Sequence, residues 1–433
     1  MSDVSLVCEQ AKKAFLALAP LNHVIRNKGL LSVSKILNSQ TTQILIENQK
    51  DLEVAKKMVE KGEIATSLLD RLKLNESKVK EISDGVLAVS ELHDPLNKIQ
   101  MSTLLDEGLK LDRISCPIGV IAAIFESRPD ALVQIASLCI KSGNVVILKG
   151  GREAFHTNLL LAKLISSALI DAGIPKGTLQ LLEGREDVKS LLSRDDAIDL
   201  LIPRGGNDFV RYIKENSNIP VLGHTDGICH LYIDAYADQE MALNLTVDSK
   251  TQYPGVCNAI ETLLVHKDVA DKFLPPIFQA LKEKNVEIRG CKKTLSIFPE
   301  MKEATENDWE TEYLDLIISV RIVETLEEAI SHINKYGSRH TDSIVTHNQN
   351  SAEKFSSNVD AASIMLNAST RFADGYRYGF GAEVGIATDK IHARGPMGIE
   401  GLITYKYRVT GNGQCVSEYS GKNARKFLHK KIL

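Results

Sequence analysis

The pattern of apolar and polar residues changes character along the chain. The first hundred residues carry apolar side chains at helical spacing, as at Leu31, Val33, Ile36 and Leu37, with charged residues on the other face. This part is predicted to form amphipathic helices. From residue 117 onward, short apolar runs alternate with helical patterns, which predicts strands and helices in turn. The predicted strands are 117–125, 144–149, 179–183, 198–202, 220–222 and 229–234.

A second alternating series follows residue 257. Its predicted strands are 261–266, 315–320, 342–346 and 362–367, with helices near 268–284 and 324–335. Strands that alternate with helices and lack hairpin turns predict right-handed crossovers and parallel sheets. The sequence therefore predicts an α/β protein with two parallel-sheet domains. The first is of the dinucleotide-binding type and spans 1–97 and 117–247, and the second spans 248–400.

Two segments do not fit this alternation. Residues 98–116 and 402–409 alternate apolar and polar side chains without a helical period, which is typical of half-exposed strands. We expect 98–116 and 401–412 to pair as a β-strand arm whose free edge is an oligomerisation surface, which predicts a homo-oligomer. Residues 413–433, rich in Lys, Ser and Gly, are expected to form a loosely held tail.

Charge and cysteine usage narrow the class of protein. The chain has 433 residues and a formal net charge of -4, which argues against nucleic acid as a partner because nucleic-acid binding is normally led by a basic face. We find neither an apolar signal-peptide core nor a run near the ~18 apolar residues of a membrane span. Six of the seven cysteines are scattered, without Cys-x-x-Cys pairs or a matching histidine cluster, so a zinc site and a disulfide framework are both disfavoured. We expect a cytoplasmic protein with no metal and no membrane partner.

One cysteine has a context suited to catalysis. Cys257 follows a Pro-Gly turn and precedes Asn258 and a strand-like run. An isolated cysteine is usually a small core residue, but polar and turn residues lie on the N-terminal side of this thiol. A thiolate at a loop tip can attack a carbonyl, and nearby N–H groups can hold the resulting oxyanion. Cys257 is the predicted nucleophile, with Asn258 beside it.

Two glycine turns follow predicted parallel strands. They are Lys149-Gly150-Gly151 and Arg204-Gly205-Gly206, and neither belongs to a G-x-G-x-x-G fingerprint. Glycines at a helix entry let a phosphate approach free backbone N–H groups, and a lysine or arginine adds charge. Either turn alone can be a plain loop, but ligands bind at the carboxyl ends of such strands.

Several motifs together resemble a known family. They are GNVVILKGG (143–151), PRGGN (203–207), LGHTDGICH (222–230), YPGVCNAIETLLVH (253–266), NASTRFADGYRYGFGAEVGI (367–386) and a signature block over 323–344. This sequence is similar over essentially its whole length to the gamma-glutamyl phosphate reductases of the aldehyde dehydrogenase superfamily. It also resembles the reductase half of pyrroline-carboxylate synthases, without their kinase half.

The resemblance implies an aldehyde-dehydrogenase-like fold and an activity. The expected reaction is NADPH-dependent reduction of L-glutamyl 5-phosphate to glutamate 5-semialdehyde through a Cys257 thioester, in proline biosynthesis. The first domain would bind NADPH and the second would be catalytic. The implied NADPH-binding residues are Lys149, Arg204, Gly205, Gly206 and Glu312. A glutamate 5-kinase is a possible partner that would supply the acyl phosphate.

One difference from the superfamily affects the expected fate of the thioester. Hydrolytic aldehyde dehydrogenases begin an E-L-G-G-K motif with a glutamate that activates water, and Val221 stands at that position here. Valine cannot take a proton from water, so the thioester would be left for hydride. The alternative function, an NAD(P)-dependent dehydrogenase of another small aldehyde, would be expected to retain that glutamate.

The substrate's phosphate and carboxylate call for cationic and polar donors near Cys257. Arginine suits them because its planar fork binds such groups bidentately. Each candidate could equally belong to a structural ion pair, and His332 and His340 are expected to hold a loop rather than transfer protons. The candidate substrate-binding residues are Ser127, Arg128, His224, Lys250, Arg371 and Arg377.

Overall fold

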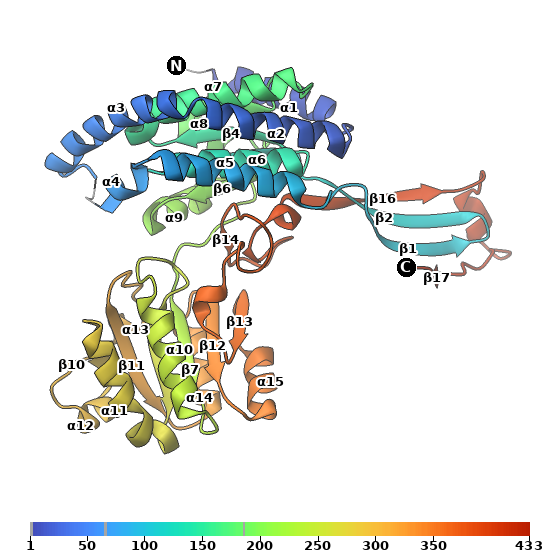
Figure 1. Cartoon of the computed structure of the whole chain (residues 1–433). Helices are drawn as coiled ribbons and strands as arrows, with labels where there is room; N and C mark the ends of the chain where they lie inside the picture. The colour runs from blue at the N-terminus through green and yellow to red at the C-terminus, as the bar shows by residue number, and fades with distance from the viewer. Residues whose placement is uncertain (1–2, 65–66, 185–186) are drawn as a thin grey trace.

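A computed structural model describes residues 3–64, 67–184 and 187–433 of the chain. The described chain forms two α/β lobes and a β-sheet arm that projects from the first lobe (Figure 1). The two lobes and the arm are the three parts that the hydrophobic pattern predicts, and the α/β class with two parallel sheets is confirmed.

The first lobe is built on a four-stranded parallel sheet in the order β5-β4-β3-β6. All six residues of the central strand β3 are buried, as expected where helices cover both faces of a parallel sheet. The strands are β3 (Val120–Phe125), β4 (Val145–Gly150), β5 (Leu179–Leu182) and β6 (Leu200–Arg204). The predicted strand at 220–222 is absent, and only Val221 forms a bridge there, to Leu201.

Nine helices of the described residues surround this sheet. Several begin at residues suited to helix capping: the Asp3 carboxylate accepts from the Ser5 and Leu6 N–H groups, and Asn22 and Asn75 act similarly. The helices are α1 (Val4–Leu18), α2 (His23–Ser39), α3 (Thr41–Glu60), α4 (Ser67–Leu72), α5 (Glu76–Glu91), α6 (Pro129–Lys141), α7 (Phe155–Asp171), α8 (Asp187–Leu192) and α9 (Asn207–Glu215).

The second lobe contains a seven-stranded parallel sheet in the order β10-β9-β11-β8-β7-β12-β13. Its strands are β7 (Cys229–Ile233), β8 (Ile260–His266), β9 (Glu287–Gly290), β10 (Lys302–Glu303), β11 (Ile317–Val323), β12 (Thr341–Val345) and β13 (Ser363–Leu366). The helices are α10 (Gln239–Thr251), α11 (Lys267–Glu283), α12 (Lys292–Ile297), α13 (Glu306–Trp309), α14 (Leu326–Tyr336) and α15 (Gln349–Asn358).

The predicted domain boundaries need two corrections. Strand β7 pairs with β8 and β12, so it and α10 belong to the second lobe, and the boundary at 247/248 is wrong. The segment after residue 373 returns to the first lobe, where Val384, Met397 and Leu402 are part of that lobe's hydrophobic core. This returning segment contains β14 (Ile386–Ala387) and β15 (Gly395–Pro396), which pair antiparallel.

The arm is a four-stranded antiparallel sheet in the order β16-β2-β1-β17. The expected pairing between the two isolated segments is present, but 98–116 forms a hairpin rather than one strand. The strands are β1 (Ile99–Asp106), β2 (Leu109–Pro117), β16 (Ile403–Thr410) and β17 (Lys430–Lys431). The prediction of a loose tail is wrong, because β17 pairs with β1 and Arg425 forms an ion pair with Asp106 at 2.6 Å.

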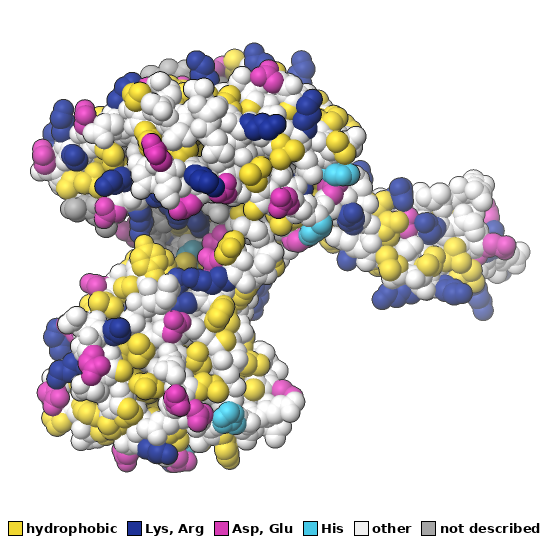
Figure 2. Space-filling model, in the orientation of Figure 1, with side chains coloured by type: hydrophobic (Ala, Val, Ile, Leu, Met, Phe, Trp, Pro, Cys, Tyr) yellow, Lys and Arg dark blue, Asp and Glu magenta, His cyan; other side chains and the backbone are white. Residues whose placement is uncertain are grey.

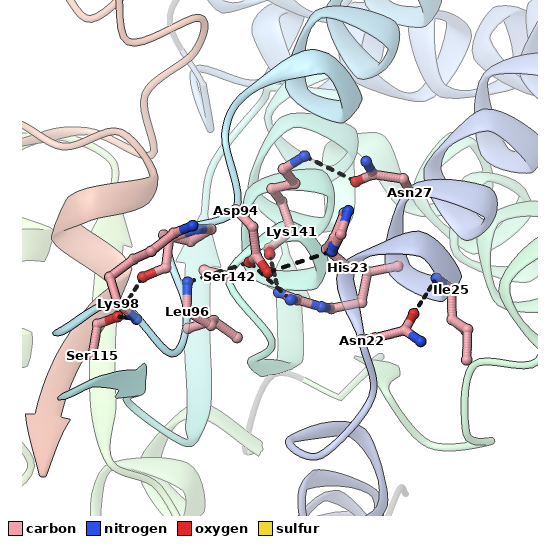
Figure 3. Close-up of polar contacts among 12 residues, drawn as sticks. Asn22, His23, Ile25, Asn27, Asp94, Leu96, Lys98, Ser115, Lys141 and Ser142 are labelled. Carbon is pink, nitrogen blue, oxygen red and sulfur yellow. Dashed lines mark hydrogen bonds and ion pairs between the residues drawn. The ribbon is translucent and has the colours of Figure 1, made fainter.

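A buried polar cluster holds the root of the arm against the first lobe (Figure 3). The Arg26 guanidinium on α2 is 1% exposed, donates to the Lys141 carbonyl of α6, and lies 2.9 Å from the Asp94 carboxylate. Lys141 Nζ donates to Asn27 Oδ1 and to the Ser90 carbonyl. The loop between α5 and β1 is therefore tied to two helices of the first lobe.

The space-filling view shows a hollow between the two lobes and the arm standing clear of both (Figure 2). No helix of the described ranges is long and apolar enough to cross a membrane.

Candidate active site

Cys257 lies in the turn between α10 and β8, both of which belong to the second lobe. Its thiol is free and half-buried. Gly227 packs against this turn so closely that a Cβ there would lie 2.3 Å from the Cys257 carbonyl oxygen. A larger residue at 227 would push the chain segment that carries His224 away from the thiol.

Two histidines accompany the thiol. One ring nitrogen from each of His224 and His340 and the Cys257 Sγ all lie within 4.8 Å of one another. His224 Nδ1 lies 2.9 Å from the Ile386 carbonyl oxygen, which can only accept, so Nδ1 carries the proton and Nε2 keeps a free lone pair. Burial lowers the pKa of His224, which keeps this imidazole neutral. The sequence led us to expect that His340 holds a loop. Its position beside the thiol was not predicted.

A second cysteine supports the backbone of the first. The Cys229 Sγ donates to the Cys257 carbonyl at 3.1 Å and lies 3.6 Å from His340 Nδ1. Burial raises the pKa of the Cys229 thiol well above its ordinary value, so it stays protonated as a donor. Cys257, half-buried in its turn, is the more accessible of the two.

Arginines near the thiol lack acidic partners. Among the described residues, no carboxylate lies within 4.0 Å of the Arg204, Arg371 or Arg377 guanidinium groups, whereas other arginines pair with acids. Burial and the neighbouring Arg128 lower the pKa of Arg204, and the negative potential of Glu383 and Cys257 opposes this. Burial and Arg377 lower the pKa of Arg371, again opposed by Cys257.

The Arg204 side chain packs against the returning segment. A Cβ at Gly385 would lie 3.0 Å from its Nη1. The resemblance implied a role for Arg204 in cofactor binding. Arg371 donates from Nε to Gln252 Oε1 at 2.9 Å, and Arg377 donates from Nη1 to the Arg371 carbonyl.

Three other candidates for substrate binding are occupied by protein partners. Ser127 is buried, with a φ of 46°, and its N–H and hydroxyl both donate to Glu153 Oε1. Arg128 pairs with Asp130 at 3.0 Å. Lys250 is wrong as a substrate ligand, because it is fully buried and bonded to the equally buried Glu261 at 2.5 Å.

Asn258 is placed to support the loop rather than the oxyanion. Its Nδ2 donates to the Ala373 carbonyl at 2.8 Å, and its side chain is buried. Its Oδ1 has no hydrogen-bond partner among the described residues. The amide thus ties the cysteine turn to the start of the returning segment.

The two glycine turns follow β4 and β6, the strands on either side of β3 in the sheet of the first lobe. Gly205 and Gly206 precede α9, whose N-terminus has no side-chain cap, and a Cβ at Gly206 would meet nothing within 4 Å. The Glu126 carboxylate accepts from the Gly206 N–H at 3.1 Å, and burial raises its pKa. Lys149 Nζ donates to the Gly150 carbonyl at 2.6 Å, and burial lowers its pKa.

Glu312 links the two lobes. Its Oε2 accepts from Asn207 Nδ2, on the first turn of α9, at 2.8 Å. Asn207 Nδ2 also lies 3.1 Å from Asp226 Oδ1. Burial raises the pKa of Glu312. A carboxylate of the second lobe therefore contacts the first turn of α9 through Asn207.

Sequence reasoning missed four residues that the structure brings to this region. Glu126 and Asn207 frame the end of α9, His340 lies near the thiol, and the Glu383 carboxylate acts on Arg204. Asn207 was part of a quoted motif, and His340 was part of the signature block. Glu126 and Glu383 stand inside or beside quoted segments but carry no local pattern of their own.

Comparison with known proteins agrees with this architecture. The aldehyde dehydrogenase family model matches residues 1–294. The chain is 53% identical over 430 residues to the gamma-glutamyl phosphate reductase of Acetivibrio thermocellus. The aligned region covers 99% of this chain and 98% of the Acetivibrio protein. It is 50% identical over 432 residues to the enzyme of the same name from Nostoc punctiforme, covering 100% and 98%.

Solved structures agree as well. The crystal structure of gamma-glutamyl phosphate reductase from Thermotoga maritima has a TM-score of 0.92 and 39% identity, covering 96% of this chain and 100% of that chain. The Saccharomyces cerevisiae protein of the same name has a TM-score of 0.55 and 37% identity, covering 97% and 100%. The chain belongs to the gamma-glutamyl phosphate reductase family of the aldehyde dehydrogenase superfamily.

Proposed function

We propose that this protein reduces L-glutamyl 5-phosphate to L-glutamate 5-semialdehyde, with NADPH as reductant and release of phosphate, in proline biosynthesis. Family membership supports the reaction. The observation that carries the mechanism is the half-buried Cys257 thiol beside arginines that have no acidic partner within 4.0 Å among the described residues. An acyl phosphate with a remote carboxylate is a substrate that needs both a nucleophile and such cations.

The thiol of Cys257 starts the reaction. The S–H bond breaks and the proton passes to His224, whose Nε2 is unprotonated while Nδ1 donates to the Ile386 carbonyl. The sulfur bonds to the acyl carbon, the bond from that carbon to the phosphate oxygen breaks, and a thioester and free phosphate form. His224 then releases the proton to solvent. Phosphate is a good leaving group, so the step needs no strong general acid. The Cys257 N–H is a candidate donor to the oxyanion, a contribution worth a few kcal/mol on the order of one oxyanion-hole donor.

Arginines orient the substrate. Arg204 comes from the first lobe, and Arg371 and Arg377 come from the segment that follows β13. We assign the phosphate and the α-carboxylate to these three guanidinium groups, since each can bind an anionic group with two parallel N–H bonds. Binding would bring one lobe's cation and the other lobe's thiol to the same molecule.

The residues at the end of α9 suit a nicotinamide dinucleotide. An uncapped helix N-terminus preceded by two glycines can hold a phosphate, and Glu312 lies beside Asn207 to accept from a ribose hydroxyl. The Glu126 carboxylate accepts a hydrogen bond from the Gly206 N–H, and this bond would have to break before a phosphate could bind that N–H. When bound, NADPH supplies the hydride that converts the thioester to the aldehyde. Lys149 offers the cation of this region, and we expect it to favour the phosphorylated cofactor.

Hydrolysis of the thioester is expected to be slow. Val221, which stands where hydrolytic relatives carry a glutamate, is half-buried against the core of the first lobe and bridges to Leu201. It offers no base at that position. The polar side chain of the same turn that reaches the thiol is His224, three residues further on.

Location and assembly follow the same reasoning. All seven cysteines are free thiols, which suits the reducing cytoplasm. The projecting arm suits a homo-oligomer, and a glutamate 5-kinase would be the enzyme that delivers the labile acyl phosphate.

The test runs the reaction backwards. Pyrroline carboxylate, phosphate and NADP+ are supplied, and NADPH formation is followed by absorbance. We expect Cys257→Ser to abolish phosphate-dependent turnover, because an alcohol is a far weaker nucleophile near neutral pH. Cys291→Ser is the matched control and should behave as wild type. Substantial turnover in the Cys257 variant would remove the covalent mechanism, and wild-type turnover without phosphate would remove the proposed substrate.

A further inference from the structure

The cluster around Cys257 has the composition of a metal site. A thiol sulfur and one ring nitrogen from each of His224 and His340 lie within 4.8 Å of one another. His224 lies in the segment between α9 and β7, Cys257 in the turn before β8, and His340 directly before β12, so no sequence spacing reveals the cluster. Sulfur and imidazole nitrogen are the ligands that zinc prefers in proteins.

Each histidine has one ring nitrogen that no described residue hydrogen-bonds. His224 Nδ1 faces the Ile386 carbonyl, which leaves the Nε2 lone pair available. His340 is fully buried, and its Nδ1 lies 2.9 Å from the Thr341 hydroxyl. His340 Nε2 is buried without a hydrogen-bond partner among the described residues. A buried nitrogen without a partner is costly, so a ligand that it can bind is favoured there.

From this geometry we propose that Cys257, His224 and His340 form a binding site for a thiophilic divalent cation of the zinc class, which holds the nucleophile in an inactive state. In a tetrahedral zinc site the sulfur and nitrogen ligand atoms lie roughly 3.3–3.8 Å apart. The three ligand atoms here lie within 4.8 Å of one another, so side-chain rotations that move each atom by about 1 Å would produce that arrangement. The fourth position is left to solvent. Binding exchanges the thiol proton for the metal: the S–H bond breaks, the proton goes to water, and the S–Zn bond forms.

The consequence is reversible inhibition. A metal-bound thiolate cannot attack the acyl phosphate, so a chelator would restore turnover. This consequence rests on the proposed function, whereas the existence of the site does not. The test therefore reads the metal directly.

Co2+ is the probe, because a thiolate bound to it produces a sulfur-to-metal charge-transfer absorption in the near ultraviolet. The full chain, stripped of metal by a chelator and kept free of oxygen, is titrated with Co2+. We expect one equivalent to bind with that absorption and to be displaced by Zn2+. Cys257→Ser should abolish the absorption, and Cys291→Ser, which removes another half-buried thiol, should keep it.

The histidine variants decide the geometry. Loss of outer-shell partners typically weakens metal binding about 10–100-fold, so His224→Ala and His340→Ala should each weaken it at least that much. His224 is half-buried, which keeps the test valid if the His340 variant does not fold. Independently, Zn2+ should slow alkylation of Cys257 by iodoacetamide in the wild type. Absence of the charge-transfer band in the wild type, or a band that persists unchanged in both histidine variants, would overturn the proposal.

Discussion

Charged residues around Cys257 differ in whether the protein neutralises them. Lys250 is fully buried beside Glu261, so its charge serves the fold. Arg204 and Arg371 are at least partly buried and have no carboxylate within 4.0 Å among the described residues. An unneutralised arginine at low exposure costs folding free energy, which a bound anion would offset. The sequence motifs contain both kinds of residue without distinguishing them.

This difference predicts the effect of replacing Arg204. Arg204→Lys keeps the charge but loses the two-pronged hydrogen-bond geometry, so we expect KM for the acyl phosphate to rise about tenfold, the equivalent of roughly 1.4 kcal/mol. Initial rates over a range of substrate concentrations measure it. Arg194→Lys is the control, because Arg194 pairs with Asp196 on the surface of the same lobe. Equal KM values for both variants would show that Arg204 does not bind substrate.

One buried histidine is expected to contribute to the pH dependence of stability. His332 is 4% exposed and packs against Trp309, Tyr336 and His230. Burial lowers its pKa from 6.5 to about 2. The unfolded chain therefore takes up a proton near pH 6.5 that the folded chain refuses. The stability that neutral His332 contributes is present above pH 6.5 and is lost as the pH falls toward 2.

Because of this histidine, we expect the free energy of unfolding to be up to about 2 kcal/mol lower at pH 5 than at pH 8. Urea unfolding at both pH values measures it. His332→Gln should reduce the pH dependence by that amount, since glutamine does not titrate, while the exposed His347→Gln should leave it unchanged. An identical pH slope in wild type and His332→Gln would contradict the assignment.

At the scale of elements, the root of the arm depends on one carboxylate. Asp94 follows α5 and accepts from Arg26 on α2, which in turn donates to the end of α6. The same carboxylate accepts from the Leu96 N–H, at the start of the arm (Figure 3). Two helices and the arm therefore share one buried charge interaction.

Removing that charge should destabilise the first lobe. Asp94→Asn leaves Arg26 buried without a counter-charge, and we expect a loss of about 2–4 kcal/mol in the free energy of unfolding. Chemical denaturation measures it. Asp84→Asn is the control, because Asp84 is half-exposed and pairs only with the exposed Lys80 of the same helix. The prediction fails if the two variants are equally stable.

At the scale of the whole molecule, the arm is the part that lacks a partner. It projects from the first lobe (Figure 1), and β16 carries exposed apolar side chains at Tyr405, Tyr407 and Val409. Among the described residues β16 pairs on one side only, with β2, so its outer edge is a template for strand addition. We expect this surface to join copies of the chain.

Two substitutions test this surface. Tyr407→Glu with Val409→Glu places carboxylates on the exposed arm strand, and we expect the mass in light scattering to fall toward the 47.7 kDa of one chain. Val416→Glu is the control, since Val416 is also exposed but lies outside β16. A wild-type mass of one chain, or an unchanged mass in the double variant, would show that the arm does not assemble the protein.

The sequence by itself determined the kinds of elements and most of their positions. Strands buried on both faces appear as continuous apolar runs, and helix ends carry capping residues, so both can be recognised locally. The arm segments were visible for the same reason. The tail was not, because Lys430 and Lys431 pair with β1 through backbone hydrogen bonds, which no side-chain pattern reveals.

Tertiary structure decided the properties that local sequence patterns do not encode. Sheet membership is one such property: β7 has the same apolar character as strands of the first lobe, yet it pairs with β8 and β12 of the second. The candidate site is another. Cys257 was predicted from its own turn, but the positions of His340 and Arg204 beside it depend on chain segments between 50 and 90 residues away. Lys250 forms an ion pair with Glu261, whereas among the described residues no carboxylate lies within 4.0 Å of Arg204. This difference is decided only when distant segments pack together.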